Sequence, residues 1–154
     1  MNINSAIIRG AKILESSFII NPFLDSEILM AKAIRKDRKF ILLNSNIHLK
    51  SKDLRFFENL IKKRSVGNPI AYITGKKFFW NSEFTVSKDT LIPRPDTELL
   101  IETVLRLTSH KNKLNILDIG IGSGCVLLTI LKERKNFYGT GIDTSKNCLN
   151  ISKL

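Results

Sequence analysis

The sequence contains few of the residues that form metal sites and disulfide frameworks. Only two cysteines and two histidines occur among its 154 residues. Cys125 and Cys148 form no CxxC pair, and neither is matched with histidines at metal-ligand spacing. We therefore predict two reduced, buried thiols and no metal site, and we interpret His48 and His110 as isolated surface residues rather than catalytic bases.

Long hydrophobic runs are also missing. No segment approaches the roughly 18 consecutive apolar residues that a membrane span requires. Residues 1–4 lack the basic start and apolar run of a secretory signal. Apolar residues make up 43% of the chain and charged residues 25%, a composition typical of globular proteins rather than disordered ones. We predict a cytoplasmic protein that does not enter a membrane.

Acidic residues are outnumbered by basic ones, mostly in the first part of the chain. The net charge is +11 and the pI is 9.9. Residues 1–66 carry 13 Lys and Arg against 6 Asp and Glu, whereas residues 67–110 carry 5 of each kind and residues 111–154 carry 7 against 3. A positive module of this kind could face RNA, a ribosome or an acidic protein. We favour a solvated lysine-rich surface, so direct nucleic-acid binding is not the preferred interpretation.

Apolar residues at helical spacing predict a bundle of short helices over residues 1–66. The first helix is expected to be capped by Ser5 and to bury Ile7, Ala11, Leu14 and Phe18. Further helical patches are expected after Asn21-Pro22, at Phe40–Leu43, and from Ser51 with Leu54, Phe57 and Ile61 facing inward. Gly67-Asn68-Pro69 then ends the helical pattern and marks a domain boundary.

The periodicity changes after this boundary. Clustered aromatic residues predict a β-hairpin that turns near Asn81, and a rigid extended segment at 91–95 precedes a helix. That helix is expected to bury Leu100, Val104 and Leu107. A strand at 114–117, a helix at 126–133 and a strand at 137–142 then form a βαβ unit, whose two strands should be parallel.

A glycine loop closes the first strand of this unit. Gly120, Gly122 and Gly124 give G-x-G-x-G, whereas a dinucleotide fingerprint needs a glycine where Cys125 or Leu127 stands. The absence of a Lys-Ser or Lys-Thr pair after the loop also argues against a phosphate-binding Walker loop. The strand ends in Asp118 before the loop, and the next strand ends in Asp143, whose carboxylate suits a ribose diol. This pattern is typical of S-adenosylmethionine-dependent methyltransferases.

Several segments together carry a more specific pattern. They are Gly67-x-Pro69-x-x-Tyr72-x-x-Gly75, the aromatic run Phe78-Phe79-Trp80, the segment Leu91-Ile92-Pro93-Arg94-Pro95-Asp96-Thr97-Glu98, and Leu117-Asp118-Ile119-Gly120-Ile121-Gly122-Ser123-Gly124. The whole chain thereby closely resembles the HemK family, the peptide chain release factor glutamine methyltransferases. Asn81 departs from the glycine that relatives often have after the aromatic pair, but Asn-Ser can also form a turn.

The resemblance implies an α+β fold in three parts. These are a helical substrate-recognition domain at 1–66, a β-hairpin linker at 67–90, and an incomplete Rossmann-like methyltransferase domain at 91–154 that contains the first βαβ unit. S-adenosylmethionine is the implied cofactor, with Gly120, Ile121, Gly122, Ser123 and Gly124 on its methionine moiety and sugar, and Asp143 on its ribose hydroxyls. Asp118 is expected to order the loop or meet the ligand's amino group, and Pro93, Arg94 and Pro95 are expected to wall the active site.

The implied reaction transfers a methyl group to the side-chain amide nitrogen of the glutamine in the Gly-Gly-Gln motif of release factors 1 and 2. The family's Asn-Pro-Pro-Tyr loop, which grips that amide, does not occur in this sequence. We therefore expect an N-terminal part of such an enzyme, inactive by itself and monomeric when complete. The alternatives are a non-catalytic module that binds a release factor or the ribosome, and a related enzyme that methylates a ribosomal-protein glutamine.

Overall fold

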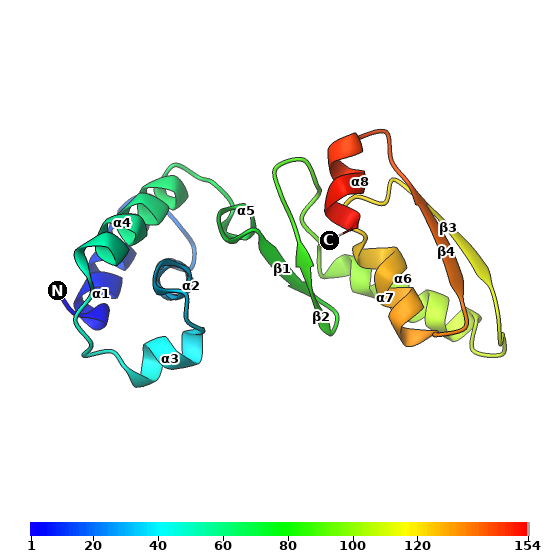
Figure 1. Cartoon of the computed structure of the whole chain (residues 1–154), viewed down its shortest axis with the longest axis horizontal. Helices are drawn as coiled ribbons and strands as arrows, with labels where there is room; N and C mark the ends of the chain where they lie inside the picture. Colours follow the sequence, from blue (N-terminus) through cyan, green and yellow to red (C-terminus); the bar gives the residue numbers. More distant parts are fainter. Residues whose placement is uncertain (154) are drawn as a thin grey trace. The chain divides into compact units, whose positions relative to one another are not determined.

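The computed structural model describes residues 1–153 and has an α+β architecture, as the sequence predicts (Figure 1). The chain divides into two compact units, residues 1–74 and residues 75–154. The first unit contains helices only, and the second contains two small sheets and three helices among its described residues. No helix within residues 1–153 is both long enough and apolar enough to cross a bilayer.

The first unit is a helical bundle with a closed hydrophobic core. Its helices are α1 (Ile3–Ser16), α2 (Pro22–Ile34), α3 (Arg38–Leu43), α4 (Ser51–Ser65) and α5 (Ile70–Thr74). The core residues at most 2% exposed include Ile3, Leu14, Leu29, Phe57 and Ile61. These residues recur at helical spacing, so the amphipathic pattern and the core have the same origin.

Two expectations for α1 are wrong. Asn2 is the N-cap, because its Oδ1 accepts a hydrogen bond from the Ser5 backbone N–H at 2.8 Å, so Ser5 already lies inside the helix. The helix ends at Ser16, and Phe18 adopts a left-handed φ of 58° with 94% of its surface exposed. The turn toward α2 therefore directs Phe18 into solvent, although its spacing continues the buried face.

Helices α1, α2 and α4 pack closely. A Cβ placed at Gly10 of α1 would lie 2.7 Å from Ser26 Oγ and 2.8 Å from Phe57 Cζ, so this crossing has room only for glycine. Asp25 near the start of α2 accepts a hydrogen bond from Arg64 Nε near the end of α4 at 2.7 Å. Because the start of one helix meets the end of the other, α2 and α4 run antiparallel.

The second unit begins with an antiparallel hairpin of β1 (Lys76–Phe79) and β2 (Ser82–Thr85). Phe79 pairs with Ser82, so the turn consists of Trp80 and Asn81, as the sequence predicts. Trp80 has a φ of 53°, and its backbone N–H donates to Glu98 Oε1 at 2.9 Å while its Nε1 donates to Glu133 Oε1 at 2.8 Å. These bonds attach the hairpin tip to the following helices.

Helix α6 (Asp96–Leu107) buries a different stripe from the one expected. Ile101 is fully buried and packs with Phe79, Phe84, Ile130 and Phe137, and Val104 packs against this cluster. The expectation that Leu100 and Leu107 are buried is wrong, because both are exposed. The hairpin and α7 contact one side of α6 only, and this contact selects the face that contains Ile101.

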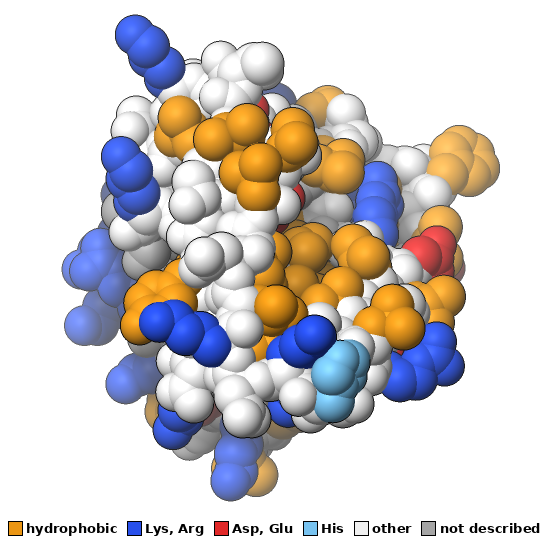
Figure 2. Space-filling view, turned by 90° about the vertical axis from the view of Figure 1, so that its right-hand side faces the viewer, with side chains coloured by type: hydrophobic (Ala, Val, Ile, Leu, Met, Phe, Trp, Pro, Cys, Tyr) orange, Lys and Arg blue, Asp and Glu red, His pale blue; other side chains and the backbone are white. Residues whose placement is uncertain are grey.

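The βαβ unit consists of β3 (Asn115–Ile119), α7 (Cys125–Glu133) and β4 (Tyr138–Ile142), followed by α8 (Lys146–Ser152). The strands are parallel with Ile119 opposite Ile142, which confirms the predicted pairing. A Cβ at Gly139 would lie 2.6 Å from Leu127 Cδ1, so the glycine lets β4 approach α7. The other face of the sheet exposes Leu117, Ile119, Tyr138 and Ile142, and Figure 2 shows hydrophobic side chains gathered on that side.

Candidate functional site

The glycine loop is built onto the ends of both parallel strands. The backbone N–H groups of Gly120 and Ile121 donate to the carbonyl of Ile142 at 2.8 and 3.0 Å. Gly120, Gly122 and Gly124 have φ values of 84°, 55° and 80°, a left-handed region that only glycine enters without strain. The sequence therefore specifies the loop conformation through its glycines, and the loop leads directly into α7.

Asp143 closes the loop from the tip of β4. Its Oδ2 accepts a hydrogen bond from the Gly122 N–H at 3.0 Å, and its Oδ1 accepts one from the Ser145 N–H at 2.9 Å. The N–H groups of Ser145 and Gly122 lower the pKa of Asp143 below its ordinary value, because they stabilise the ionised carboxylate. Each carboxylate oxygen has further acceptor capacity, so Asp143 can order the loop and still accept a hydroxyl group.

Asp118 lies on β3 directly before the loop and has the opposite electrostatic character. Partial burial raises the pKa of Asp118, and the negative charge of Asp143 adds to the rise. Two carboxylates of opposite pKa tendency thus flank the same loop. Such a pair favours a ligand that carries positive charge, because a cation lowers the electrostatic cost of ionising both groups.

One cavity brings the predicted wall segment and the glycine loop together. It has a volume of about 130 Å³ and is lined by Leu91, Ile92, Pro93, Arg94, Thr97, Asp118, Gly120, Ile121, Gly122, Ser123, Cys125 and Val126. The two regions are separated by more than twenty residues in sequence. Pro93 is buried and Arg94 is exposed at the cavity, so the rigid segment supplies both an apolar wall and a cation.

A second cavity lies beside the strand tips. It has a volume of about 310 Å³, and its lining residues are Ile119, Gly120, Ile142, Asp143 and Thr144. Gly120 therefore lines both cavities. No heavy atom lies within 4 Å of a Cβ built at Gly120, so the space beside its backbone is open. The apolar Ile119 and Ile142 side chains next to the Asp143 carboxylate suit a ligand with a flat apolar part and hydroxyl groups.

The loop also contains a buried hydroxyl with unused hydrogen-bonding capacity. Ser123 is 5% exposed, and its Oγ forms no hydrogen bond of good geometry within the described part of the chain; its polar neighbour is the weakly interacting thiol of Cys125. A buried hydroxyl that is so weakly paired favours a ligand or water that completes its hydrogen bonds. Together with the open space at Gly120 and the two carboxylates, this hydroxyl fits a polar cofactor that carries hydroxyl and ammonium groups.

Two predicted site residues line neither cavity, and several residues that do were not predicted. Gly124 is the N-cap of α7, and Pro95 is the N-cap of α6, so both act on helix starts. The residues that sequence reasoning missed include Thr97, Cys125 and Thr144. Thr97 belongs to the segment Leu91–Glu98, and Cys125 directly follows the glycine loop, but the sequence of these segments does not indicate which side chains face the cavity.

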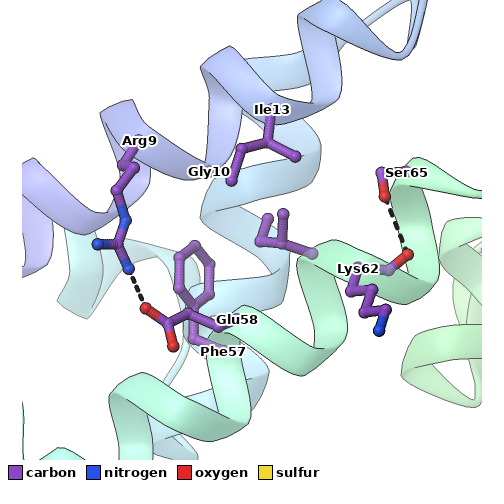
Figure 3. A pocket seen from close by; sticks show the side chains of 8 residues that line it. Arg9, Gly10, Ile13, Phe57, Glu58, Lys62 and Ser65 are labelled. Atoms are coloured by element: carbon purple, nitrogen blue, oxygen red, sulfur yellow. Dashed lines mark hydrogen bonds and ion pairs between the residues drawn. The ribbon is translucent and has the colours of Figure 1, made fainter.

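The helical unit has a groove of its own, between α1 and α4 (Figure 3). Its volume is about 150 Å³, and its lining includes the apolar side chains of Ile13, Phe57 and Ile61. Arg9 forms an ion pair with Glu58 at one end, as the dashed line in Figure 3 marks. Lys62 also lines the groove, so its charged groups are one ion pair and one further cation, without the paired carboxylates of the glycine loop.

Residues 5–75 match the family described as PrmC N-terminal domain. The chain is 40% identical over 154 residues to the release factor glutamine methyltransferase of Buchnera aphidicola subsp. Schizaphis graminum, covering all of this chain and 55% of that protein. It is 38% identical over 133 residues to the enzyme of the same name from Coxiella burnetii, covering 86% of this chain and 48% of that protein.

These matches confirm the resemblance seen in the sequence. Residues 5–75 are similar to the PrmC N-terminal domain, and the whole chain is similar in sequence to release factor glutamine methyltransferases. The chain spans about half the length of the curated relatives it matches.

Proposed function

We propose that this chain binds S-adenosylmethionine at the glycine loop and serves the methylation of a glutamine side-chain amide in the Gly-Gly-Gln motif of class I release factors. The observation that carries the proposal is the convergence of Pro93 and Arg94 with Asp118, Gly122 and Ser123 around one cavity. The names of the relatives support the reaction and its protein substrate.

The residues divide the work along the loop. Asp143 would accept hydrogen bonds from the ribose hydroxyls, Gly120 and Gly122 would contact the ligand through their backbone, and Asp118 with the Ser123 hydroxyl would hold the polar end of the methionine moiety. When bound, S-adenosylmethionine supplies an electrophilic methyl group on a sulfonium centre. Pro93 excludes water from the cavity, which matters because an amide nitrogen is a weak nucleophile and must be aligned without competition.

The substrate amide also has to be held in place. The Asn-Pro-Pro-Tyr loop that the resemblance assigns to this task does not occur among the 154 residues. We propose a Rossmann-like cofactor half of the site, preceded by a helical module that recognises the release factor. Incubation of this chain with cofactor and an unmethylated release factor should give no multiple-turnover methylation by mass spectrometry.

Isothermal titration of the chain with S-adenosylmethionine, NAD⁺ and ATP tests the cofactor assignment. We expect saturable binding of S-adenosylmethionine and none of the two phosphate-containing ligands, because the loop is followed by neither the dinucleotide nor the Walker pattern. Tighter binding of NAD⁺ than of S-adenosylmethionine would overturn the proposal. The three ligands discriminate well because S-adenosylmethionine carries a cationic sulfonium group, whereas NAD⁺ and ATP carry anionic phosphates.

A further inference from the structure

The helical unit contains a cationic cavity at the junction of α2 and α4. It has a volume of about 410 Å³ and is lined by Ala33, Ile34, Arg35, Lys50, Lys52, Asp53 and Phe56. The antiparallel packing of the two helices, held at its far end by the Asp25–Arg64 ion pair, places the end of α2 beside the start of α4. Residues at the end of α2 and residues at the start of α4, which are at least 15 positions apart in sequence, thus line the same cavity.

The charges in this cavity are unbalanced. Three cationic side chains, from Arg35, Lys50 and Lys52, share the cavity with a single carboxylate, that of Asp53. None of the three cations takes part in an ion pair with any residue in the described ranges. The arrangement contrasts with the α1–α4 groove, where Arg9 is paired with Glu58.

Helix electrostatics add to the positive potential. Lys50 is the N-cap of α4 and Lys52 lies in its first turn, and no side chain caps this helix start. Cations at the positive end of a helix dipole are unfavourable, whereas an anion there is favourable. Asp53 in the same first turn offsets part of this repulsion, and an anionic ligand would relieve the rest.

Arg35 occupies a position that usually belongs to glycine. It is the C-cap residue of α2, with a left-handed φ of 56°. Glycine adopts this conformation without strain, so a long cationic side chain here has a conformational cost. Its exposed guanidinium extends the positive surface beyond the two lysines.

The apolar lining indicates what kind of anion fits. Phe56 is 45% exposed, and Ala33 and Ile34 also line the cavity. A ligand that places a carboxylate next to an apolar side chain matches both parts of this surface. The Asp53 carboxylate disfavours a phosphate more than a carboxylate, because repulsion grows with the charge of the ligand.

We propose that the α2–α4 cavity is a docking site for an acidic, partly apolar segment of the protein substrate. This inference rests on the proposed function, in which the substrate is a protein. In that arrangement, Arg35, Lys50 and Lys52 pair with carboxylates of the segment, and Phe56 contacts its apolar side chain. Such charge complementarity mainly accelerates association and fixes register.

Binding of the full chain to an unmethylated class I release factor, measured by titration at low and high salt, tests the proposal. The test variant combines Arg35→Gln, Lys50→Gln and Lys52→Gln. The control variant combines Lys12→Gln, Lys62→Gln and Lys63→Gln, which removes the same charge from other parts of the same unit. A third variant, Lys50→Arg with Lys52→Arg, keeps the charge, and circular dichroism checks that all three are folded.

We expect the test variant to lose at least about tenfold in affinity and most of its salt dependence, and the control to lose no more than about threefold. The arginine variant should bind like the intact chain. Equal losses in test and control would overturn the docking site, as would unchanged binding of the test variant, and in both cases the proposed function stands. If the intact chain does not bind the release factor, the docking site and the recognition role of the helical unit both fail, whereas the titration with S-adenosylmethionine decides the cofactor assignment separately. The same variants are also titrated with a single-stranded RNA. If the test variant loses affinity for the RNA but not for the release factor, the cavity is a nucleic-acid site and the proposal is wrong.

Discussion

The two compact units bury their hydrophobic residues to different extents. In the helical unit, Ile3, Leu14 and Phe57 are at most 2% exposed. In the second unit, no residue of β3 or β4 is fully buried, and Ile119 is 76% exposed. The helices cover one another, whereas the two-stranded parallel sheet is covered by α7 on one face only.

The helical unit and the second unit therefore have different roles, the first in folding stability and the second in ligand binding. The helical unit owes its stability to a closed apolar core, with local capping at α1 and an ion pair between α2 and α4. In the second unit, glycines, carboxylates and the weakly paired Ser123 hydroxyl lie at the strand ends, where a ligand can reach them. Substitutions should therefore affect folding most in the first unit and ligand binding most in the second.

The largest effect should come from Phe57→Ala in the helical core. Loss of a buried aromatic side chain costs about 3–5 kcal/mol of unfolding free energy through lost burial and the remaining cavity. Hydrogen exchange of α1 and α4 amides in urea measures this loss in the helical unit. A loss below about 1 kcal/mol would show that the closed core does not stabilise the bundle.

A smaller effect, on ligand binding rather than folding, should follow from Gly141→Ala. The added Cβ would collide with the Ile121 side chain and displace the glycine loop. We expect S-adenosylmethionine affinity to fall at least about tenfold, which corresponds to about 1.4 kcal/mol. Gly67→Ala is a control, because it also adds one methyl group at a glycine, but a Cβ there would meet nothing within 4 Å. Equal loss of affinity in both variants would contradict the role of the Gly141 contact.

The two carboxylates should give the second unit opposite pH dependences. The lowered pKa of Asp143 gives a stabilising contribution that is present above its ordinary value of 3.8 and is lost as the pH falls through the folded value. The raised pKa of Asp118 gives a contribution that is present below 3.8 and is lost as the pH rises through the folded value. Urea midpoints from the fluorescence of the single tryptophan, Trp80, measure both.

Substitution of each aspartate by asparagine shows which of the two causes the change of stability in each pH range. Asp143→Asn should remove the loss of stability on the acid side, and Asp118→Asn should remove the fall that begins above 3.8. If neither variant changes the profile between about pH 3 and pH 7, the two carboxylates do not have the electrostatic surroundings described here.

The smallest effect should come from Ile119→Thr on the open sheet face. The side chain is already exposed to solvent, and threonine retains a β-branched shape, so the unfolding free energy should change by no more than about 0.5 kcal/mol. Trp80 fluorescence in urea measures this change. A loss comparable with that of Phe57→Ala would show that this face is covered in solution.

Local sequence signals predicted most elements. The glycines at 120, 122 and 124 specify the loop, and period-3.6 spacing specifies the helices around Leu14 and Phe57. Two short helices, α5 and α8, were missed, although Ser145 caps α8 through a hydrogen bond from the Cys148 N–H to its Oγ. The predicted boundaries at 66 and 90 and the separate hairpin linker remain predictions.

Features that depend on tertiary contacts were harder to predict. The buried stripe of α6 contains Ile101 rather than Leu100 because the hairpin packs on that side. The motif residues Pro93, Arg94 and Ser123 line one cavity, and their roles toward a ligand remain predictions. Cys125 and Thr97 join them only because the segment 91–94 folds against the loop, which no local pattern encodes.

The most direct test of the account is the affinity of the chain for S-adenosylmethionine, compared with the affinities of Asp143→Ala and Asp89→Ala. Both variants remove one carboxylate, but only Asp143 lines a cavity beside the glycine loop. We expect saturable binding by the intact chain, at least about tenfold weaker binding by Asp143→Ala, and unchanged binding by Asp89→Ala. Absence of saturable binding by the intact chain, or equal affinities for all three proteins, would contradict it.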